Sequence, residues 1–257
     1  MAKGPQMTIK SAALAALLFA SPAYADWPVD AMNTAIDQTN FVVNKGCSGT
    51  LIDIENKYIL TAAHCVEAQY ATREREKIDD NGVITKEKYR KLIDGSVSQL
   101  VLDSGTTTRT TTYRVTLKAV DRDNDLAVVQ VVGVLPNTVV ATLAKAEPRR
   151  GDKVFVVGNP MGLYTTVHAG IVSSVERSYG SIDFGGQTHE RLMQVSAGII
   201  GGNSGGAVYN ADGELVGVPV IAHRNNEVLG FVVPLDVIKT FLKANRLEKP
   251  VEPVDVY

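Results

Sequence analysis

The 257-residue sequence lacks the features that mark a metal centre or a nucleic-acid surface. It contains two cysteines and four histidines, and these do not stand at the spacings that metal sites use. Its 26 basic residues nearly balance its 28 acidic ones, and they are scattered along the chain rather than gathered in one stretch. We therefore expect no metal, no cofactor and no nucleic-acid partner.

Long apolar runs are also scarce, which bears on whether the chain has a membrane anchor. The run near the start, over residues 12–20, is too short to cross a bilayer. It follows a basic start, whether that start is Met1 or Met7, and it precedes a small-x-small site ending at Ala25, an order typical of a secretory signal peptide. We predict a signal peptide over residues 1–25 and a secreted or periplasmic mature chain without a membrane anchor.

Helix patterns are few, and strand patterns recur along most of the sequence. Short runs rich in β-branched and aromatic residues alternate with turns, as in all-β proteins. Residues 66–97 break this pattern: they are polar, and we interpret them as a solvated excursion, with the mixed charges of 72–80 on a loop or an exposed helix. Apolar residues recur at helical spacing over 235–245, which predicts a C-terminal helix.

The length of the mature chain suits two small β-barrels packed together. A connector with prolines and a basic pair separates two groups of strand patterns and predicts a linker over the surface. The predicted organisation is a signal peptide at 1–25, an N-terminal segment at 26–37, a first barrel at 38–135, a linker at 136–150, a second barrel at 151–234, and a helix and tail at 235–257.

Ser204 stands among glycines, in the segment Gly201-Gly202-Asn203-Ser204-Gly205-Gly206. A serine hydroxyl is a weak nucleophile, so it needs a neighbouring base and donors for the negative charge that develops on a substrate. Glycines allow the backbone to turn with positive φ and to aim consecutive N–H groups at one point. Such a segment is also typical of an ordinary turn, so its meaning depends on the rest of the chain.

A histidine and an acidic turn supply the partners that such a serine needs. His64 follows an apolar run and precedes Cys65, although a histidine in that place is also typical of a buried core residue. Asp121, Asp123 and Asp125 lie in a turn that leads into an apolar strand pattern. The chain order histidine, aspartate, serine is the order found in chymotrypsin-type catalytic triads, and other triad folds use different orders.

With these motifs, the chain resembles the trypsin-like serine peptidases, and most closely their HtrA/Deg-type branch. The resemblance covers roughly residues 38–244. The motifs that point to the branch are Asp-Leu-Ala-Val at 125–128, Val-Gly-Asn-Pro-Met-Gly-Leu at 157–163, Gly-Ile-Val-Ser at 170–173 and Gly-Phe-Val-Val-Pro at 230–234.

The resemblance implies an all-β fold of two six-stranded antiparallel β-barrels of the chymotrypsin type, with a C-terminal helix. It also implies a polypeptide substrate and hydrolysis of peptide bonds through an acyl-enzyme. HtrA/Deg-type proteases often carry a peptide-binding PDZ domain after the protease domain. The stretch after the predicted helix is too short for one, so we expect none in this polypeptide. The oligomeric state stays open.

The resemblance assigns a role to each member of the triad. Ser204 is the predicted nucleophile, His64 the general base that later returns the proton, and Asp125 the carboxylate that orients the histidine. We prefer Asp125 to Asp121 and Asp123 because it directly precedes Leu-Ala-Val, as in the family motif.

The oxyanion hole is predicted in the same segment as the nucleophile. The backbone N–H groups of Gly202 and Ser204 form it, and Asn203 between them shapes the loop. Asn203 carries no charge where many trypsin-like enzymes have an aspartate that pairs with a new N-terminus. We therefore expect no activation by zymogen cleavage.

Cys47 and Cys65 are the only cysteines, and a secreted chain meets an oxidising compartment. We expect a disulfide between them, which holds the backbone around His64. Two free thiols are the alternative.

The primary specificity pocket is expected at Gly198 and Ile199, just before the oxyanion loop. No aspartate lies there to pair with a buried lysine or arginine of a substrate, so we expect a small or medium apolar residue at the cleaved position. A cleft strand beside the pocket is expected to pair with an extended substrate through the residues Val220, Ile221 and Ala222.

Two positions in this strand depart from family patterns. Pro219 stands where glutamyl-specific relatives usually have a histidine, so glutamyl specificity is a minor alternative, which the nearby His223 keeps open. Val220 stands where many relatives have a hydroxyl residue that supports the catalytic aspartate. His168 is interpreted as structural or as bordering the cleft, and His189 as solvated.

A protein of another class also fits this fold. Non-catalytic binding or adhesion modules with a protease fold usually lose a triad member or the glycine of the oxyanion loop. Both features are present here, which favours the enzyme.

Overall fold

The computed structural model describes residues 27–44, 46–67, 70–78, 80, 82–92, 95–103, 107–136, 138–177, 191–223 and 226–247. The predicted signal peptide and His189 lie outside the described residues, as does part of the C-terminal tail. No helix in the described ranges has the length and apolar character that a bilayer span needs.

The first barrel closes six antiparallel strands in the order β1-β2-β3-β8-β7-β6. Their bounds are β1 Phe41–Val43, β2 Cys47–Asp53, β3 Tyr58–Ala62, β6 Ser96–Asp103, β7 Thr107–Asp121 and β8 Leu126–Val132. Strand β8 begins with four consecutive buried residues, from Leu126 to Val129. A strand that is buried on both faces carries a continuous apolar run rather than an alternation, which explains this part of the sequence.

The second barrel closes in the order β10-β11-β14-β13-β12-β9. Its strands are β9 Lys153–Gly158, β10 Thr166–Arg177, β11 Leu192–Val195, β12 Ala207–Asn210, β13 Leu215–His223 and β14 Asn226–Pro234. Helix α3, Leu235–Ala244, follows directly and packs against β13 and β14 with four buried apolar side chains. The predicted architecture of two six-stranded antiparallel barrels with a C-terminal helix is confirmed.

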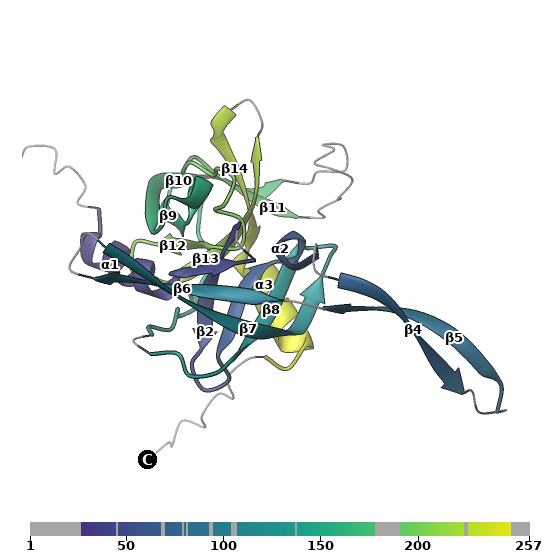
Figure 1. Ribbon diagram of the computed structural model, residues 1–257. Helices are drawn as coiled ribbons and strands as arrows, with labels where there is room; N and C mark the ends of the chain where they lie inside the picture. Colours follow the sequence, from purple (N-terminus) through teal and green to yellow (C-terminus); the bar gives the residue numbers. More distant parts are fainter. Residues whose placement is uncertain are drawn as a thin grey trace, which may run out of the picture.

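Two further helices position parts of the molecule that matter for the site. Helix α1, Val29–Gln38, precedes the first barrel in sequence yet packs against β9 and β10 of the second (Figure 1). Helix α2, Ala63–Glu67, is a short turn of helix at the end of β3 and carries His64. A 3-10 turn at Pro160–Gly162 follows β9.

The polar excursion is a β-hairpin, not a loop or an exposed helix. Strands β4, Tyr70–Ile78, and β5, Ile84–Leu92, pair over their whole length and extend away from the barrels (Figure 1). The register places an acidic residue opposite a basic one where Glu76 faces Lys86. Opposite charges that face each other across an antiparallel pair stabilise it, so a charged sequence folds here as strands.

The two barrels share one apolar core. The largest cluster of buried side chains includes Phe41 and Leu60 of the first barrel together with Phe155 and Tyr209 of the second. The buried Tyr209 hydroxyl hydrogen-bonds the Thr39 hydroxyl at 2.7 Å, and burial raises the pKa of this tyrosine. The seam between the barrels is therefore a packed interface.

Candidate active site

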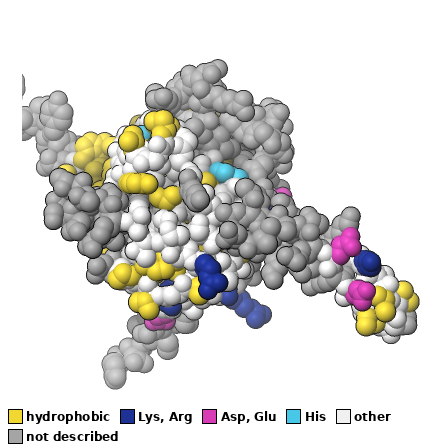
Figure 2. Space-filling model, viewed as in Figure 1, with side chains coloured by type: hydrophobic (Ala, Val, Ile, Leu, Met, Phe, Trp, Pro, Cys, Tyr) yellow, Lys and Arg dark blue, Asp and Glu magenta, His cyan; other side chains and the backbone are white. Residues whose placement is uncertain are grey.

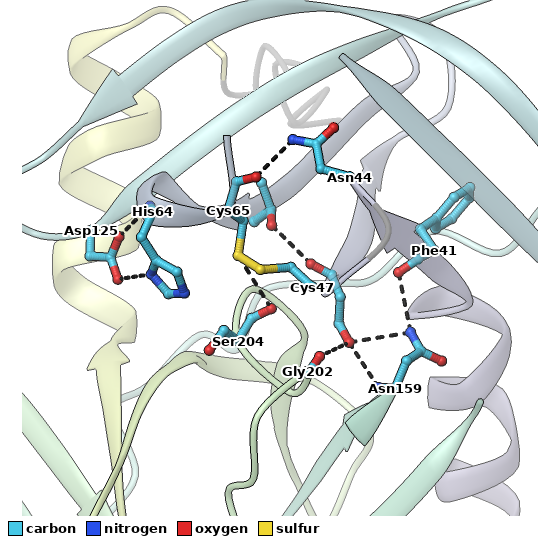
Figure 3. The surroundings of a disulfide bond; sticks show 11 residues. Phe41, Asn44, Cys47, His64, Cys65, Asp125, Asn159, Gly202 and Ser204 are labelled. Carbon is cyan, nitrogen blue, oxygen red and sulfur yellow. Dashed lines mark hydrogen bonds and ion pairs between the residues drawn. A yellow bond between two sulfur atoms is a disulfide. The ribbon is translucent and has the colours of Figure 1, made fainter. Parts of the chain in front are cut away.

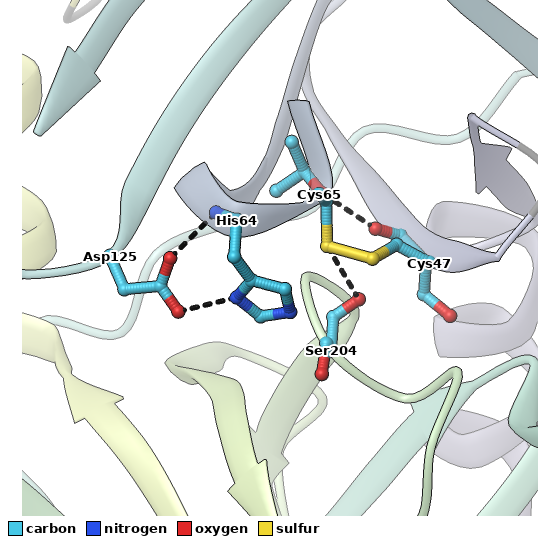
Figure 4. A network of polar contacts seen from close by, with 7 residues as sticks. Cys47, His64, Cys65, Asp125 and Ser204 are labelled. Atoms are coloured by element: carbon cyan, nitrogen blue, oxygen red, sulfur yellow. Dashed lines mark hydrogen bonds and ion pairs between the residues drawn. A yellow bond between two sulfur atoms is a disulfide. The ribbon is translucent and has the colours of Figure 1, made fainter. Parts of the chain in front are cut away.

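His64 and Asp125 face each other at the edge of the first barrel (Figure 4). The Nδ1 atom of the imidazole lies 2.6 Å from Oδ2 of Asp125. The backbone N–H of His64 donates to the other carboxylate oxygen at 2.8 Å. Asp125 is only 1% exposed, whereas the histidine side chain is 36% exposed. The buried carboxylate therefore fixes the ring and its proton on Nδ1, and leaves Nε2 as the nitrogen that can accept a proton.

Of the three aspartates in the turn before β8, Asp125 is the one that contacts His64. Asp121 binds within its own turn, where its Oδ1 accepts the N–H groups of Asp123 and Asn124. Asp125 adopts a positive φ of 54°, and its carbonyl accepts the N–H of Ala63 at 3.0 Å. This left-handed residue turns the chain sharply at the mouth of the strand, so that its side chain reaches α2.

Ser204 comes from the second barrel and meets the first at the seam. Its carbonyl accepts the N–H of Ser48 in β2 at 2.8 Å. The following residue, Gly205, has φ +79° and donates its N–H to the carbonyl of Pro219 in β13. A Cβ on Gly205 would stand 2.2 Å from the Thr61 hydroxyl oxygen, so only glycine fits. Figure 4 shows Ser204 beside the edge of the His64 ring that faces away from Asp125.

A disulfide joins Cys47 of β2 to Cys65 of α2, directly beside the histidine. The Sγ atom of Cys65 lies 3.7 Å from the Ser204 carbonyl oxygen. The two sulfurs and a ring nitrogen of His64 lie within 4.8 Å of one another. Disulfide sulfurs are not thiolates, so this cluster does not present the anionic ligands that zinc requires.

The loop before Ser204 forms a tight turn with a defined orientation. The N–H of Asn203 donates to the Ile200 carbonyl at 2.9 Å, and Gly202 has φ +106°, which is the geometry of a type II turn. The Gly201 carbonyl accepts the N–H of Met161 at 2.9 Å. In a trans peptide the C=O and N–H point in opposite directions, so the N–H of Gly202 points away from Met161.

The N–H groups of Gly202 and Ser204 donate to no other group in the part of the chain that the structure describes. Asn203, between them, uses its own N–H in the turn and is buried, with 1% exposed. The loop thus presents two backbone donors two residues apart, and the residue between them supports the turn.

Two residues that the sequence patterns did not predict, Ser48 and Asn159, hold this loop. Figure 3 shows Asn159 beside Gly202. The buried Ser48 hydroxyl donates to the Gly202 carbonyl at 2.8 Å and accepts the Asn159 N–H at 2.8 Å. The Asn159 side-chain amide donates to the Phe41 carbonyl at 3.3 Å. The sequence contains one indication of both residues, because each is a small polar residue next to a glycine and near the end of an apolar strand pattern. The pairing itself spans 111 positions and cannot be read from the sequence.

The residues predicted for the primary pocket differ in how they can meet a substrate. Gly198 lies against the ring of His168, since a Cβ on this glycine would stand 2.6 Å from Nδ1. The Ile199 side chain is 2% exposed and packs in the second-barrel core against Gly230. The Ile199 side chain is therefore part of the core and does not face a ligand.

The predicted cleft strand is β13. Its register with β14 shifts between Pro219 and Ile221, so Val220 is the extra residue of a bulge, and Ala222 continues the strand. The Pro219 carbonyl points at Gly205 rather than at β14, so the missing N–H of proline costs the β14 ladder no bond. The Val220 side chain is buried at 5% exposure and offers no hydroxyl to Asp125.

A family model described as the trypsin-like peptidase domain matches residues 47–218. Putative protease Do-like 14 from Arabidopsis thaliana is 31% identical over 207 residues, which cover 79% of this chain and 42% of the relative. Serine protease HTRA2, mitochondrial, from Drosophila ananassae is 34% identical over 134 residues, which cover 51% of this chain and 30% of the relative. The chain thus spans less than half the length of these relatives.

Solved structures support the fold. A serine endoprotease from Yersinia pestis aligns with a TM-score of 0.56 at 24% identity, covering 83% of this chain and 66% of that one. A Mycobacterium tuberculosis protein in an inactive mutant form aligns with a TM-score of 0.60 at 18% identity. The alignment covers 90% of this chain and 96% of that one.

Proposed function

Because the chain belongs to the trypsin-like peptidase family, which its residues 47–218 match, we propose that it is an exported serine endopeptidase. The observation that carries this proposal is the pairing of His64 with a buried Asp125 at 2.6 Å, beside a serine whose loop presents two backbone donors. The similarity to HtrA and Do-like proteases supports the proposal that it is a protease of that branch.

In the proposed mechanism, the Ser204 hydroxyl attacks the substrate carbonyl while His64 Nε2 takes its proton. The tetrahedral intermediate collapses when the histidine returns this proton to the leaving amine, which leaves the acyl group on Ser204. Water then repeats the sequence and releases the acid. Asp125 stabilises the positive imidazolium in both steps through its short contact with Nδ1.

The negative charge of the intermediate is proposed to fall on an oxygen between the N–H groups of Gly202 and Ser204. The turn fixes both donors before the substrate arrives, so they need no rearrangement when the charge develops. The Met161 and Ser48 hydrogen bonds to the carbonyls of Gly201 and Gly202 support this orientation from the other side of the loop.

The proposed preference is for a small or medium apolar residue at the cleaved position. Neither Gly198 nor Ile199 supplies a carboxylate for a cationic side chain, whose burial without a partner is costly. A second candidate is glutamyl specificity, favoured by the contact between the His168 ring and Gly198. A protonated imidazole at that place would pair with a substrate carboxylate.

A peptide library with every residue at the cleaved position separates these candidates. We expect cleavage after small or medium apolar residues, unchanged in preference by His168→Ala. Cleavage after glutamate that His168→Ala abolishes would replace the first specificity with the second. Ser204→Ala should abolish all cleavage, whereas Ser173→Ala, at a half-buried serine of β10, should not. A folded parent protein that cleaves no peptide would favour the non-catalytic module.

Export is proposed from the N-terminal sequence alone. Expression with residues 1–25 in a secreting host, followed by N-terminal sequencing of the exported chain, should find Asp26 first. Retention of Met1 or Met7 on the exported protein would contradict it.

A further inference from the structure

The tip of the β4–β5 hairpin presents large apolar side chains to solvent. Ile78, at the end of β4, is 66% exposed, and Ile84, opposite it at the start of β5, is 61% exposed. Val83, which precedes β5, is 53% exposed. Figure 2 shows the hydrophobic side chains gathered at the end of the hairpin. Apolar side chains that gather on a surface mark a site of contact with another molecule.

The hairpin has little support from the rest of the molecule. Strands β4 and β5 form a two-stranded sheet of their own, which extends away from the barrels (Figure 1). Neither core cluster contains a described residue of the hairpin, and every hairpin side chain that the structure describes is exposed. A ribbon of two strands without a third strand or a helix against it is only marginally stable in water. Its tip therefore opens at little cost in free energy.

This weak support distinguishes the tip from other exposed apolar residues. A substrate that pairs with the proposed cleft strand β13 must be extended, so it has to leave its own secondary structure first. Ile171 and Val175 lie in β10, which pairs with β9 on one side and β11 on the other. Val134 directly precedes Leu135, which is buried. Cleavage at these places would disturb a barrel, whereas the hairpin tip can open alone.

Val83 is the apolar residue of the tip that best fits the proposed specificity. Its side chain is smaller than those of Ile78 and Ile84, and the proposed preference is for a small or medium apolar residue. The two isoleucines face each other in the ladder, whereas Val83 lies outside both strands. Gly82 before it has φ +76°, and a Cβ there would meet no atom within 4 Å, so the chain around this bond is open on its acyl side.

The geometry of the hairpin requires that the cleaving molecule is a second copy. The base residues Tyr70 and Leu92 are paired, and β4 then runs outward over nine residues. At a rise of about 3.3 Å per residue, its tip lies roughly 25–30 Å beyond its base. Figure 1 shows that this direction leads away from the barrels, whose seam carries Ser204. The tip of one molecule therefore meets the site of another.

We propose that the Val83–Ile84 bond is a self-cleavage site, which a second copy of this chain hydrolyses. The inference rests on the proposed peptidase function and on its apolar preference. Ser204 Oγ of one copy bonds to the Val83 carbonyl carbon of the other, the bond from this carbon to Ile84 N breaks, and His64 gives that nitrogen the proton it took from Oγ. Water then attacks the acyl carbon, its proton returns to Oγ through His64, and Val83 is released as a carboxylate.

The two pieces are expected to stay associated after cleavage, because the first barrel takes strands from both. Strand β1 pairs with β6 and β3 pairs with β8, so each of these pairs joins the piece before the bond to the piece after it. His64 belongs to the first piece, and Asp125 and Ser204 belong to the second. The product is a two-chain protein that keeps its fold and its activity.

A mixture of two proteins tests the site directly. The Ser204→Ala protein serves as the substrate, and a small amount of the parent protein serves as the catalyst. Mass spectrometry of the products should find one piece that ends at Val83 and another that begins at Ile84, while Ser204→Ala incubated alone stays intact. The parent protein by itself should be converted faster as its total concentration rises, as an intermolecular reaction requires.

A charge at the cleaved position supplies the matched comparison. Val83→Asp in the Ser204→Ala substrate should slow its cleavage by at least about tenfold, because a carboxylate would be buried there without a partner. Val134→Asp adds the same charge at an exposed valine outside the hairpin. This second variant should be cleaved as fast as the Ser204→Ala protein without it.

Three results would overturn the self-cleavage site while leaving the peptidase in place. They are a parent protein that hydrolyses an unrelated peptide but leaves the Val83–Ile84 bond intact, a conversion rate that does not depend on concentration, and equal cleavage of the Val83→Asp and Val134→Asp substrates. A folded parent protein that hydrolyses no peptide at all would instead contradict the proposed function, and self-cleavage with it.

Discussion

At the scale of single residues, the glycines around Ser204 are the positions where the structure leaves least room for a side chain. A Cβ on Gly202 would stand 2.5 Å from the Asn159 carbonyl oxygen, and φ +106° is strained for any other residue. The sequence predicted that these glycines let two backbone N–H groups point at one place. The structure shows in addition that the Asn159 carbonyl leaves no space for a side chain on Gly202. It also adds Ser48, whose hydroxyl bridges Gly202 and Asn159 from another barrel.

Gly202→Ala is expected to lower kcat/KM roughly 10²–10³-fold, the range for loss of one oxyanion donor, because the turn must reorient to make room. The steady-state rate of hydrolysis of a peptide substrate measures this change in kcat/KM. Gly201→Ala is the matched control. A Cβ on Gly201 meets no atom within 4 Å, so kcat/KM should fall much less in this variant than in Gly202→Ala. Equal losses in both variants would show that the steric account of Gly202 is wrong.

Ser48→Ala is expected to reduce the free energy of unfolding by about 1–3 kcal/mol, because it leaves the buried N–H of Asn159 without an acceptor. Denaturant unfolding measures the change. If Ser48 positions the loop, its variant should also lose kcat while KM stays near that of the parent. A loss of stability with unchanged kcat would restrict Ser48 to a structural role, and Ser173→Ala serves as the reference for a serine outside the network.

At the scale of elements, the site is assembled from segments that end at the barrel seam. Helix α2, the turn before β8 and the loop before β12 each deliver one member of the predicted triad. Their motifs could be recognised in the sequence because each lies near one end of an apolar strand pattern: His64 follows β3, Asp125 precedes β8 and Ser204 precedes β12. The β4–β5 hairpin was not, since its charges gave no period-two apolar pattern and its stability comes from cross-strand pairs. Figure 2 shows hydrophobic side chains gathered at its end, and these include Ile78 and Ile84.

Replacing residues 71–91 by a short glycine-containing turn should leave the melting temperature within a few degrees of the parent. The hairpin contributes no described residue to either core cluster, and its base residues Tyr70 and Leu92 are paired, so a short turn can join them. Calorimetry and the rate of peptide hydrolysis measure the outcome. Loss of folding would show that the barrels depend on this hairpin, contrary to the packing described.

At the scale of the whole molecule, function depends on two barrels that share a core. The strand-rich sequence and the resemblance together predicted both barrels and the C-terminal helix, because most strands carry β-branched apolar runs. The crossing of α1 onto the second barrel was not predictable, since its contacts with β9 and β10 join segments more than a hundred positions apart. For the same reason, no local pattern connects the residues of a pocket that Val42 of the first barrel lines together with Tyr164 and Gly202 of the second.

The central claim is that these parts make Ser204 a nucleophile. Incubation of the folded protein with a fluorophosphonate, followed by mass spectrometry of the labelled peptide, tests it most directly. We predict one adduct, on Ser204, which disappears in Ser204→Ala and is strongly slowed in His64→Ala. A folded protein that stays unlabelled, or an adduct on another serine, would contradict the account.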